Sequence, residues 1–323
     1  MTVAALLAVL GRPAWWVLAI AGFLVRGGIL AFLVAVVSLP SPLALSNVLG
    51  PVVLPVALGR VSAETVVVLG LAVGFVVSWL VVGGWFAAAT EVSLIREAHG
   101  AARDEGLPTG PDRPRGRWLV TRSAAVHLLA HLPTLAAAAF ATIEAIGVAY
   151  RELTNPSDAG PIALRVVVGT AVPIVIAVGL WLLGEIVGGF AARRVVLGDA
   201  SVGRALVGAV DDVIGRPGGG LIMPVTTSAI LIVDLAAVLA IVTVVWTEVR
   251  DRLARPLDDP LATALTVATL GAAWTLALVV TGLIAAWRSV ALTFERDRVS
   301  ASATRDSSRD RDNRGIHAPP TGG

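Results

Sequence analysis

Six apolar stretches, each long enough to cross a lipid bilayer, constrain this chain more than any other feature. The hydrocarbon core of a bilayer is about 30 Å thick, and an α-helix rises about 1.5 Å per residue. Backbone polar groups in lipid must bond within the protein, and apolar stretches of this length do so as helices. The sequence therefore predicts an all-α integral membrane protein with spans at about 14–38, 65–90, 119–149, 163–192, 221–247 and 261–288.

Composition excludes several classes of site. Hydrophobic residues make up 56% of the chain and charged residues 15%, so lipid is the solvent for most of it. Cysteine is absent and all 25 basic residues are Arg, which excludes disulfides, thiolate metal sites and Schiff-base lysines. No phosphate-binding glycine loop or nucleophile elbow is visible, and we expect no cofactor. The arginines flank the spans without interleaved aromatic residues, which argues against nucleic-acid binding.

The arginines also predict the orientation of the chain. Counted by loops, 18 arginines fall on one side of the membrane and six on the other, and Arg26 is the remaining one of the 25. Basic loops stay on the cytoplasmic side, so both termini should be cytoplasmic.

Short motifs recur about every hundred residues and predict three parallel hairpins. A Gly-Arg pair precedes each outward helix, at Gly11-Arg12, Gly116-Arg117 and Gly215-Arg216. The return helices end in the similar segments GWFAAATEVSL, GGFAARRVVL and GLIAAWRSVAL. We therefore expect a six-helix transmembrane domain over 1–298, built from repeats at about 1–94, 95–200 and 201–298, and a disordered cytoplasmic tail over 299–323.

Each repeat should begin with a short interfacial helix on the cytoplasmic side. The segment SVGRALVGAVDDVIGR, residues 201–216, shows this best because apolar residues recur every fourth position and charges lie elsewhere. Between the spans, residues 97–117 are polar and rich in Pro and Gly, which predicts a mobile cytoplasmic loop. The apolar outer connection over 39–60 contains four prolines and should either dip into the membrane or cap the bundle.

Arg26 lies near the middle of the first span. A central Arg costs about 2.5–3.5 kcal/mol on insertion scales, so it should face the bundle interior and pair with a carboxylate. Asp234 and Glu185 lie at depths that an Arg side chain could reach, and we favour Asp234 because it is the only charge at the middle of its span. Such a pair could fix helix packing, or it could belong to a site for a substrate, a lipid headgroup or an ion.

His127 and His131 form a second polar cluster. They are four residues apart and so share one face of the third span, with Glu185 at a plausible depth on the next. The two histidines could form interhelical hydrogen bonds, relay protons or bind a metal ion. No His-Glu-x-x-His motif accompanies them to support the metal site.

The segments GGWFAAATEVSLIREAHG and GEIVGGFAARRVVLGDASVGRAL carry a resemblance. Their pattern of return helix and interfacial helix is similar to bacterial multi-pass membrane proteins such as the membrane domain attached to some glycerophosphoryl diester phosphodiesterases. The chain has no soluble phosphodiesterase domain, so the resemblance implies no catalytic residues. It implies a protein of the bacterial cytoplasmic (inner) membrane with an association to lipid.

Three functions remain open at this stage. The leading hypothesis is a non-enzymatic membrane protein that organises a partner or holds lipid. Its partners would be the lipid bilayer, anionic lipid at the cytoplasmic arginines, and a partner protein or a second copy of the chain. A small-solute or ion transporter or channel would need a water-filled path through Arg26, His131, Glu185 and Asp234. An intramembrane metal-dependent hydrolase would use His127, His131 and Glu185.

Overall fold

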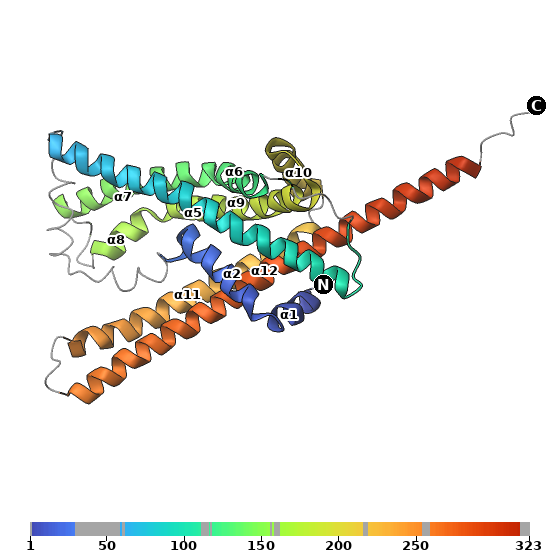
Figure 1. Cartoon of the computed structure of the whole chain (residues 1–323). Helices are drawn as coiled ribbons and strands as arrows, with labels where there is room; N and C mark the ends of the chain where they lie inside the picture. The colour runs from blue at the N-terminus through green and yellow to red at the C-terminus, as the bar shows by residue number, and fades with distance from the viewer. Residues whose placement is uncertain are drawn as a thin grey trace, which may run out of the picture. The chain divides into compact units, whose positions relative to one another are not determined.

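The structure is a computed structural model that describes residues 2–29, 59, 62–110, 116, 118–155, 157, 162–215, 219–253 and 259–316. Within these ranges every regular element is a helix, which confirms the predicted all-α class (Figure 1). In chain order the elements are α1 (Thr2–Leu10), α2 (Pro13–Phe23), the π-helical turn η1 (Leu24–Gly28), α5 (Ala63–Asp104), α6 (Leu119–Ala130), α7 (Leu132–Thr154), α8 (Ile162–Gly169), α9 (Ala171–Gly198), α10 (Val202–Gly215), α11 (Gly219–Leu253) and α12 (Pro260–Ile316).

Five of these helices are long and apolar enough to cross a membrane. Their candidate spans are Ala63–Asp104, Leu132–Glu152, Ala171–Gly198, Ile222–Arg250 and Pro260–Arg298. The segments Val3–Leu10 and Pro13–Gly28 together pass the same test but are bent by 99°, and they would make a sixth. Residues 30–38 of the predicted first span and nearly all of the outer connection over 39–60 lie outside the described residues.

Capping residues mark where two of the long helices begin. The Ser62 hydroxyl accepts a hydrogen bond from the backbone N–H of Thr65 at 3.2 Å, and α5 starts at the next residue after Ser62. Asp259 accepts from the N–H of Ala262 at 3.0 Å, and Pro260 then occupies the first helical position of α12. Both arrangements satisfy backbone donors that a helix start otherwise leaves without an intrahelical partner.

Two of the predicted spans are broken rather than continuous. The stretch 119–149 divides into α6 and α7 at His131, and 163–192 divides into α8 and α9 at Thr170. Pro133 and Pro173 follow these breaks closely, and proline has no N–H to donate to the carbonyl four residues earlier. We predicted unbroken helices here, and the proline positions explain the difference.

Two helices run further than the sequence predicts. α5 continues to Asp104, so the first part of the expected loop over 97–117 is helical. α12 continues to Ile316, through most of the tail that we expected to be disordered. Nucleation is the costly step of helix formation, so a helix already established in a span is extended at low cost by the residues that follow. The predicted three-repeat arrangement stays a prediction.

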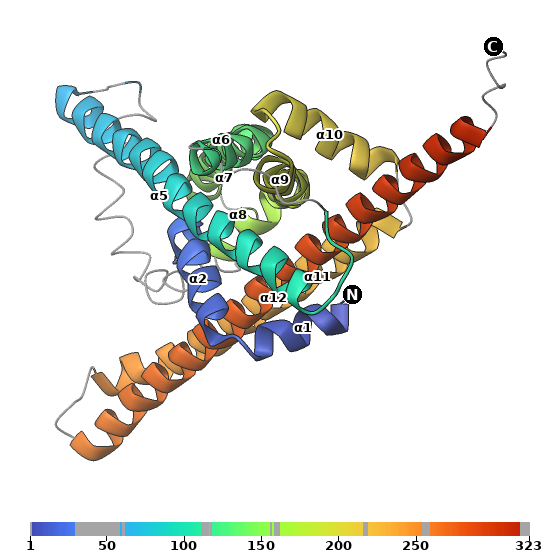
Figure 2. The same cartoon turned by 45° about the vertical axis from the view of Figure 1, so that its right-hand side comes forward.

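The described chain forms two compact units. One comprises Met1–Ala5, Ile95–Ser228 and Ser289–Gly323, and the other comprises Leu6–Leu94 and Ala229–Arg288. In the first unit, α9 packs against α6, α7 and α10 (Figure 2). This packing brings His127 of α6, and His131 at the break that follows α6, beside the glycine-rich middle of α9.

In the second unit, α11 and α12 pack side by side. Val238 and Val242 of α11 are buried, and apolar side chains of both helices and of the first span surround them: Phe23, Leu24, Leu235, Leu270, Trp274, Ala277 and Leu278. Small residues bring α2 and η1 against α5. A Cβ atom on Gly83 would lie 2.8 Å from the carbonyl oxygen of Val25, so no larger residue fits there without movement of the backbone.

We expect Gly83→Ala to destabilise the protein by about 1–3 kcal/mol, because the added methyl group would press on a backbone carbonyl. Gly84→Ala is the matched control, since a Cβ there meets nothing within 4 Å. Alanine favours helix over glycine by up to about 1 kcal/mol, so the control should be neutral or slightly stabilising. Thermal unfolding in mild detergent measures both. Equal midpoints for the two variants would show that this close approach does not exist.

Candidate functional site

Arg26 is paired with Glu91 of α5. Its Nη2 atom lies 2.8 Å from Oε2 of Glu91, and the two side chains are 32% and 14% exposed. The sequence favoured Asp234, with Glu185 as the other choice. The ion pair that the structure describes is instead formed with a carboxylate one residue beyond the predicted end of the second span.

The geometry explains how a residue near the middle of a span reaches this partner. Gly22 packs directly against Thr90, so Glu91 is level with the turn of helix that precedes Arg26. Side chains on a helix lean toward its N-terminus, and the Arg26 side chain runs back by one turn to meet the carboxylate. Arg26 also lies within η1, where Gly27 has a φ of +117°, a backbone conformation that glycine readily adopts. Long charged side chains in membranes extend toward the interface in this way.

Asp234, on α11, contacts α12 in the same unit as Arg26. Its Oδ2 atom accepts a hydrogen bond of 2.8 Å from the hydroxyl of Thr281. This contact joins the middles of two long apolar helices. Asp234 and Arg26 are both among our predicted polar sites, but Arg26 pairs with Glu91 of α5 and Asp234 accepts from Thr281 of α12.

His131 and Glu185 are brought together in the other unit, as their predicted depths suggested. Nε2 of His131 lies 3.3 Å from Oε1 of Glu185, and the side chains are 18% and 8% exposed. Nδ1 of His131 lies 2.8 Å from the backbone carbonyl oxygen of His127. His131 stands at the break between α6 and α7, so its side chain meets α9 where the helix path changes.

Two glycines on α9 make room for the histidine rings. A Cβ on Gly184 would lie 3.0 Å from Cδ2 of His131, and one on Gly188 would lie 2.8 Å from Nδ1 of His127. The glycines are four residues apart on α9, and His127 of α6 and His131 at the end of α6 are also four apart, so each glycine faces one ring. His127 is buried, and its ring centroid is 6.3 Å from that of His131. The sequence did not indicate this match between glycines and histidine rings.

The metal-site reading of this cluster has no geometric support. Across the described residues, no group of three or more His, Cys, Asp or Glu side chains is arranged to hold a metal ion. The water-filled path proposed for a transporter is not assembled within one unit either. His131 and Glu185 belong to one unit, and Arg26 and Asp234 belong to the other.

Ion pairs that the sequence did not predict lie at the arginine-rich ends of the helices. Asp212 of α10 accepts hydrogen bonds from Nε and Nη2 of Arg194 at 3.0 and 2.9 Å, and its Oδ2 atom is 3.6 Å from Nη1 of Arg296. Arg122 of α6 is 2.8 Å from Asp199, which ends α9 in a left-handed conformation. These contacts connect α6, α9, α10 and α12 within one unit.

Three further polar residues at these ends are buried. Nδ1 of His99 lies 2.8 and 3.0 Å from the carboxylate oxygens of Asp297, and the residues are 8% and 2% exposed. Arg193 is 1% exposed and donates to the carbonyl oxygens of Gly189 and Ser289 at 2.6 and 2.7 Å. We had placed His99 in a mobile loop. No local pattern in the sequence indicates that His99 is buried or that it pairs with Asp297.

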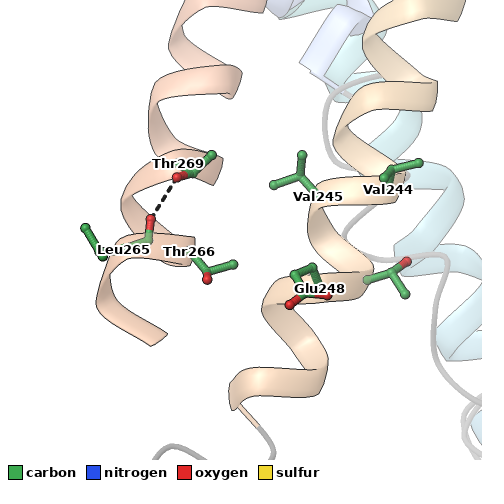
Figure 3. Close-up of a pocket in the computed structure, with 7 residues that line it drawn as sticks. Val244, Val245, Glu248, Leu265, Thr266 and Thr269 are labelled. Atoms are coloured by element: carbon green, nitrogen blue, oxygen red, sulfur yellow. Dashed lines mark hydrogen bonds between the residues drawn. The ribbon is translucent and has the colours of Figure 1, made fainter. Parts of the chain in front are cut away.

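A groove between α11 and α12 is lined by none of these residues (Figure 3). Most of its lining is aliphatic or hydroxyl-bearing, with Glu248 as the charged residue. Glu248 is already 2.8 Å from Nε of Arg252. The hydroxyl of Thr269 donates to the carbonyl oxygen of Leu265 within its own helix. The groove therefore presents no converging polar groups that would select a ligand.

Comparison with protein families, with curated proteins and with solved structures gives no match to this chain. Its function must therefore be argued from the geometry of its own residues.

We expect Arg26→Ala and Glu91→Ala each to destabilise the protein by about 1–3 kcal/mol, between the values for exposed and buried ion pairs. Each single change removes one half of the ion pair, so the double variant should recover part of the loss. Thermal unfolding of the four proteins in mild detergent measures the coupling. Glu64→Ala, at an exposed position near the start of α5, is the control and should be near neutral. Strictly additive losses would contradict a direct pair.

Asp212→Ala should destabilise the protein by about 1–2 kcal/mol, because it leaves Arg194 and Arg296 without the carboxylate that they share. Asp211→Ala is the matched control, since Asp211 is the preceding residue of α10 and is exposed. Added salt should narrow the difference between the two variants, because these groups are only partly buried. A similar unfolding temperature for both variants would rule out a stabilising role for the shared carboxylate.

Proposed function

We propose that this protein is a non-enzymatic, multi-pass protein of the bacterial inner membrane that associates with lipid at the cytoplasmic surface. Both termini are cytoplasmic in this proposal, as the distribution of arginines predicts. The resemblance to the membrane domain of some glycerophosphoryl diester phosphodiesterases is consistent with a lipid-associated role. The observation that carries the proposal is the two-faced packing of α10.

One side of α10 is small and buried. Ala205, Gly208 and Ala209 are its buried residues, and the helix packs against α9 and α6. The ion pair between Arg194 and Asp212 holds α10 to α9 on this side. A 14-residue helix is too short to cross the hydrocarbon core, so its position must be explained in another way.

The other side of α10 is apolar and open. Val207, Val210 and Ile214 are apolar residues of this side and are 64%, 40% and 71% exposed. A short amphipathic helix of this kind lies in the plane of the interface, with its apolar side at the boundary between headgroups and acyl chains. The packed side therefore attaches α10 to the bundle, and the open side is available for lipid.

Charge supports anionic lipid in particular. Arg204 of α10 and Arg96 of α5 are exposed, and Arg204 contacts the Ser201 hydroxyl rather than a carboxylate. An arginine near a membrane surface contributes about 1 kcal/mol of attraction to anionic lipid. Arg122, Arg194 and Arg296 already contact carboxylates. In this proposal the predicted contact with anionic lipid is therefore made by the exposed arginines, Arg96 and Arg204.

The residues within the spans support a non-enzymatic role. Arg26 is bonded to Glu91, Asp234 to Thr281, and His131 to Glu185. Each of these contacts joins neighbouring helices, which is the usual way in which polar side chains stabilise a helix bundle in lipid. No nucleophile with an adjacent base is placed among these residues.

Depth-dependent fluorescence quenching tests the proposal on the naturally cysteine-free chain. Val210→Cys, labelled with bimane and reconstituted in nanodiscs that contain brominated phosphatidylglycerol, should be quenched several-fold more than labelled Asp211→Cys. Asp211 is the matched control because it is also exposed and is adjacent in sequence. Adding Arg204→Gln to the Val210→Cys protein should reduce quenching by the anionic lipid more than by brominated phosphatidylcholine. Equal quenching at positions 210 and 211 would refute contact between α10 and the bilayer.

A further inference from the structure

The hydroxyl of Thr281 bonds to another helix, unlike those of its neighbours on α12. Thr266, Thr269 and Thr275 each donate to the carbonyl oxygen four residues earlier in α12. This local bond is a common one for a threonine within a helix. Thr281 is buried and donates instead to Oδ2 of Asp234 on α11, at 2.8 Å. The contact between Asp234 and Thr281 is therefore specific to this place on the two helices.

Asp234 stands near the middle of a candidate span and is partly buried. It is 12 residues from the start and 16 from the end of Ile222–Arg250, or about 18 and 24 Å along the helix. Leu231 and Val238, each about one turn away on α11, are buried. Asp234 therefore lies on the packed side of α11, between apolar side chains, rather than at either end of the span.

The first span packs against α12 beside this contact. A Cβ atom on Gly282, the residue after Thr281, would lie 3.1 Å from the carbonyl oxygen of Trp16 and 3.2 Å from Cβ of Ile20. α2 and α12 are therefore in close contact at this level, which leaves no space for water between them. Asp234, Thr281, Gly282 and α2 all belong to one compact unit.

The charged side chains of the first span have other contacts. Arg26 of η1 is 2.8 Å from Oε2 of Glu91 on α5. The guanidinium group of Arg12 lies over the ring of Trp15, 4.9 Å from its centroid. In the described part of this span, neither arginine forms an ion pair with Asp234.

On the two helices that carry the contact, the nearest charges lie about two turns away or further. Glu248 is the next charged residue of α11, 14 residues after Asp234 or about 21 Å along the helix. On α12, Arg288 is seven residues after Thr281, about 10 Å along the helix. Across the described residues, the neutral hydroxyl of Thr281 is the donor to Asp234, and no arginine or histidine forms an ion pair with it.

An ionised carboxylate is costly in such a place. It would hold a full negative charge among apolar side chains, against one neutral donor. A protonated carboxyl group has no charge, and its carbonyl oxygen still accepts the hydrogen bond from Thr281. The surroundings of Asp234 therefore favour the carboxylic acid.

We infer that Asp234 is a proton-binding site, occupied at neutral pH, in which Thr281 holds the resulting carboxylic acid. Proton binding changes the site from a charge of −1 to zero, and release returns the proton to water. With the proton bound, α11 crosses the bilayer without a charge at its middle. The site is independent of the proposed role of α10.

Infrared spectroscopy of the full-length protein in dodecyl maltoside tests this, because that detergent has no carbonyl group to obscure a carboxylic acid band. Aspartate in water is ionised at about pH 7, so an exposed one gives no such band. Protein labelled with carbon-13 at the aspartate carboxyl should show an acid band that shifts with the label and that Asp234→Asn removes. Asp211→Asn, at an exposed position, is the control and should leave the band unchanged. Thr281→Val should move the band to higher frequency, because it removes the hydrogen bond.

A band that Asp234→Asn removes and Thr281→Val shifts supports the site. A wild-type spectrum without a label-sensitive acid band, or with one that Asp234→Asn retains in full, shows that Asp234 is ionised and refutes the site. A band that Thr281→Val does not shift refutes the part of Thr281 in holding the acid. If Asp234→Asn does not fold, Asp234→Glu in the aspartate-labelled protein replaces it, and an unshifted band should then take the place of the label-sensitive one.

Discussion

Lipid cannot solvate a charged or hydrogen-bonding group, and the internal contacts of this protein follow from that constraint. A polar side chain within a span is stabilised by a partner on another helix or on its own backbone. Hydrogen bonds and ion pairs act over short distances, so two helices must approach closely where such side chains meet. The glycines of this chain stand at those places: Gly22 and Gly83 near Arg26, and Gly184 and Gly188 beside the histidine rings. Small residues and polar contacts therefore act together, because each contact depends on the approach that the glycines permit.

Much of the fold could be predicted from the sequence because the length of an apolar run is a direct physical requirement for crossing a bilayer. The ends and breaks of helices were predicted less well. Pro133 and Pro173 were visible in the sequence, but hydropathy alone does not register a missing N–H. The extension of α12 was missed for a related reason, since low hydrophobicity predicts exposure to water and says nothing of a helix already nucleated upstream.

The candidate sites show where sequence reasoning reaches its limit. His131 and Glu185 were predicted together because they lie on consecutive spans at similar depth. Arg26 was assigned to the wrong carboxylate because depth was measured at Cα, whereas a long side chain carries its charge a full turn away. The buried pair of His99 and Asp297 joins positions 198 apart, and no local pattern marks either residue.

One oxygen atom of Asp212 has a consequence for how α10 moves. Oδ2 meets Arg194 from α9 and Arg296 from α12, so a single carboxylate is shared by three helices. If that carboxylate rotates away from one arginine, it also leaves the other. These contacts therefore provide no stable intermediate in which α10 is only partly detached. The helix should therefore undock cooperatively, as one local unfolding unit, with its backbone amides losing protection from hydrogen exchange together rather than one turn at a time.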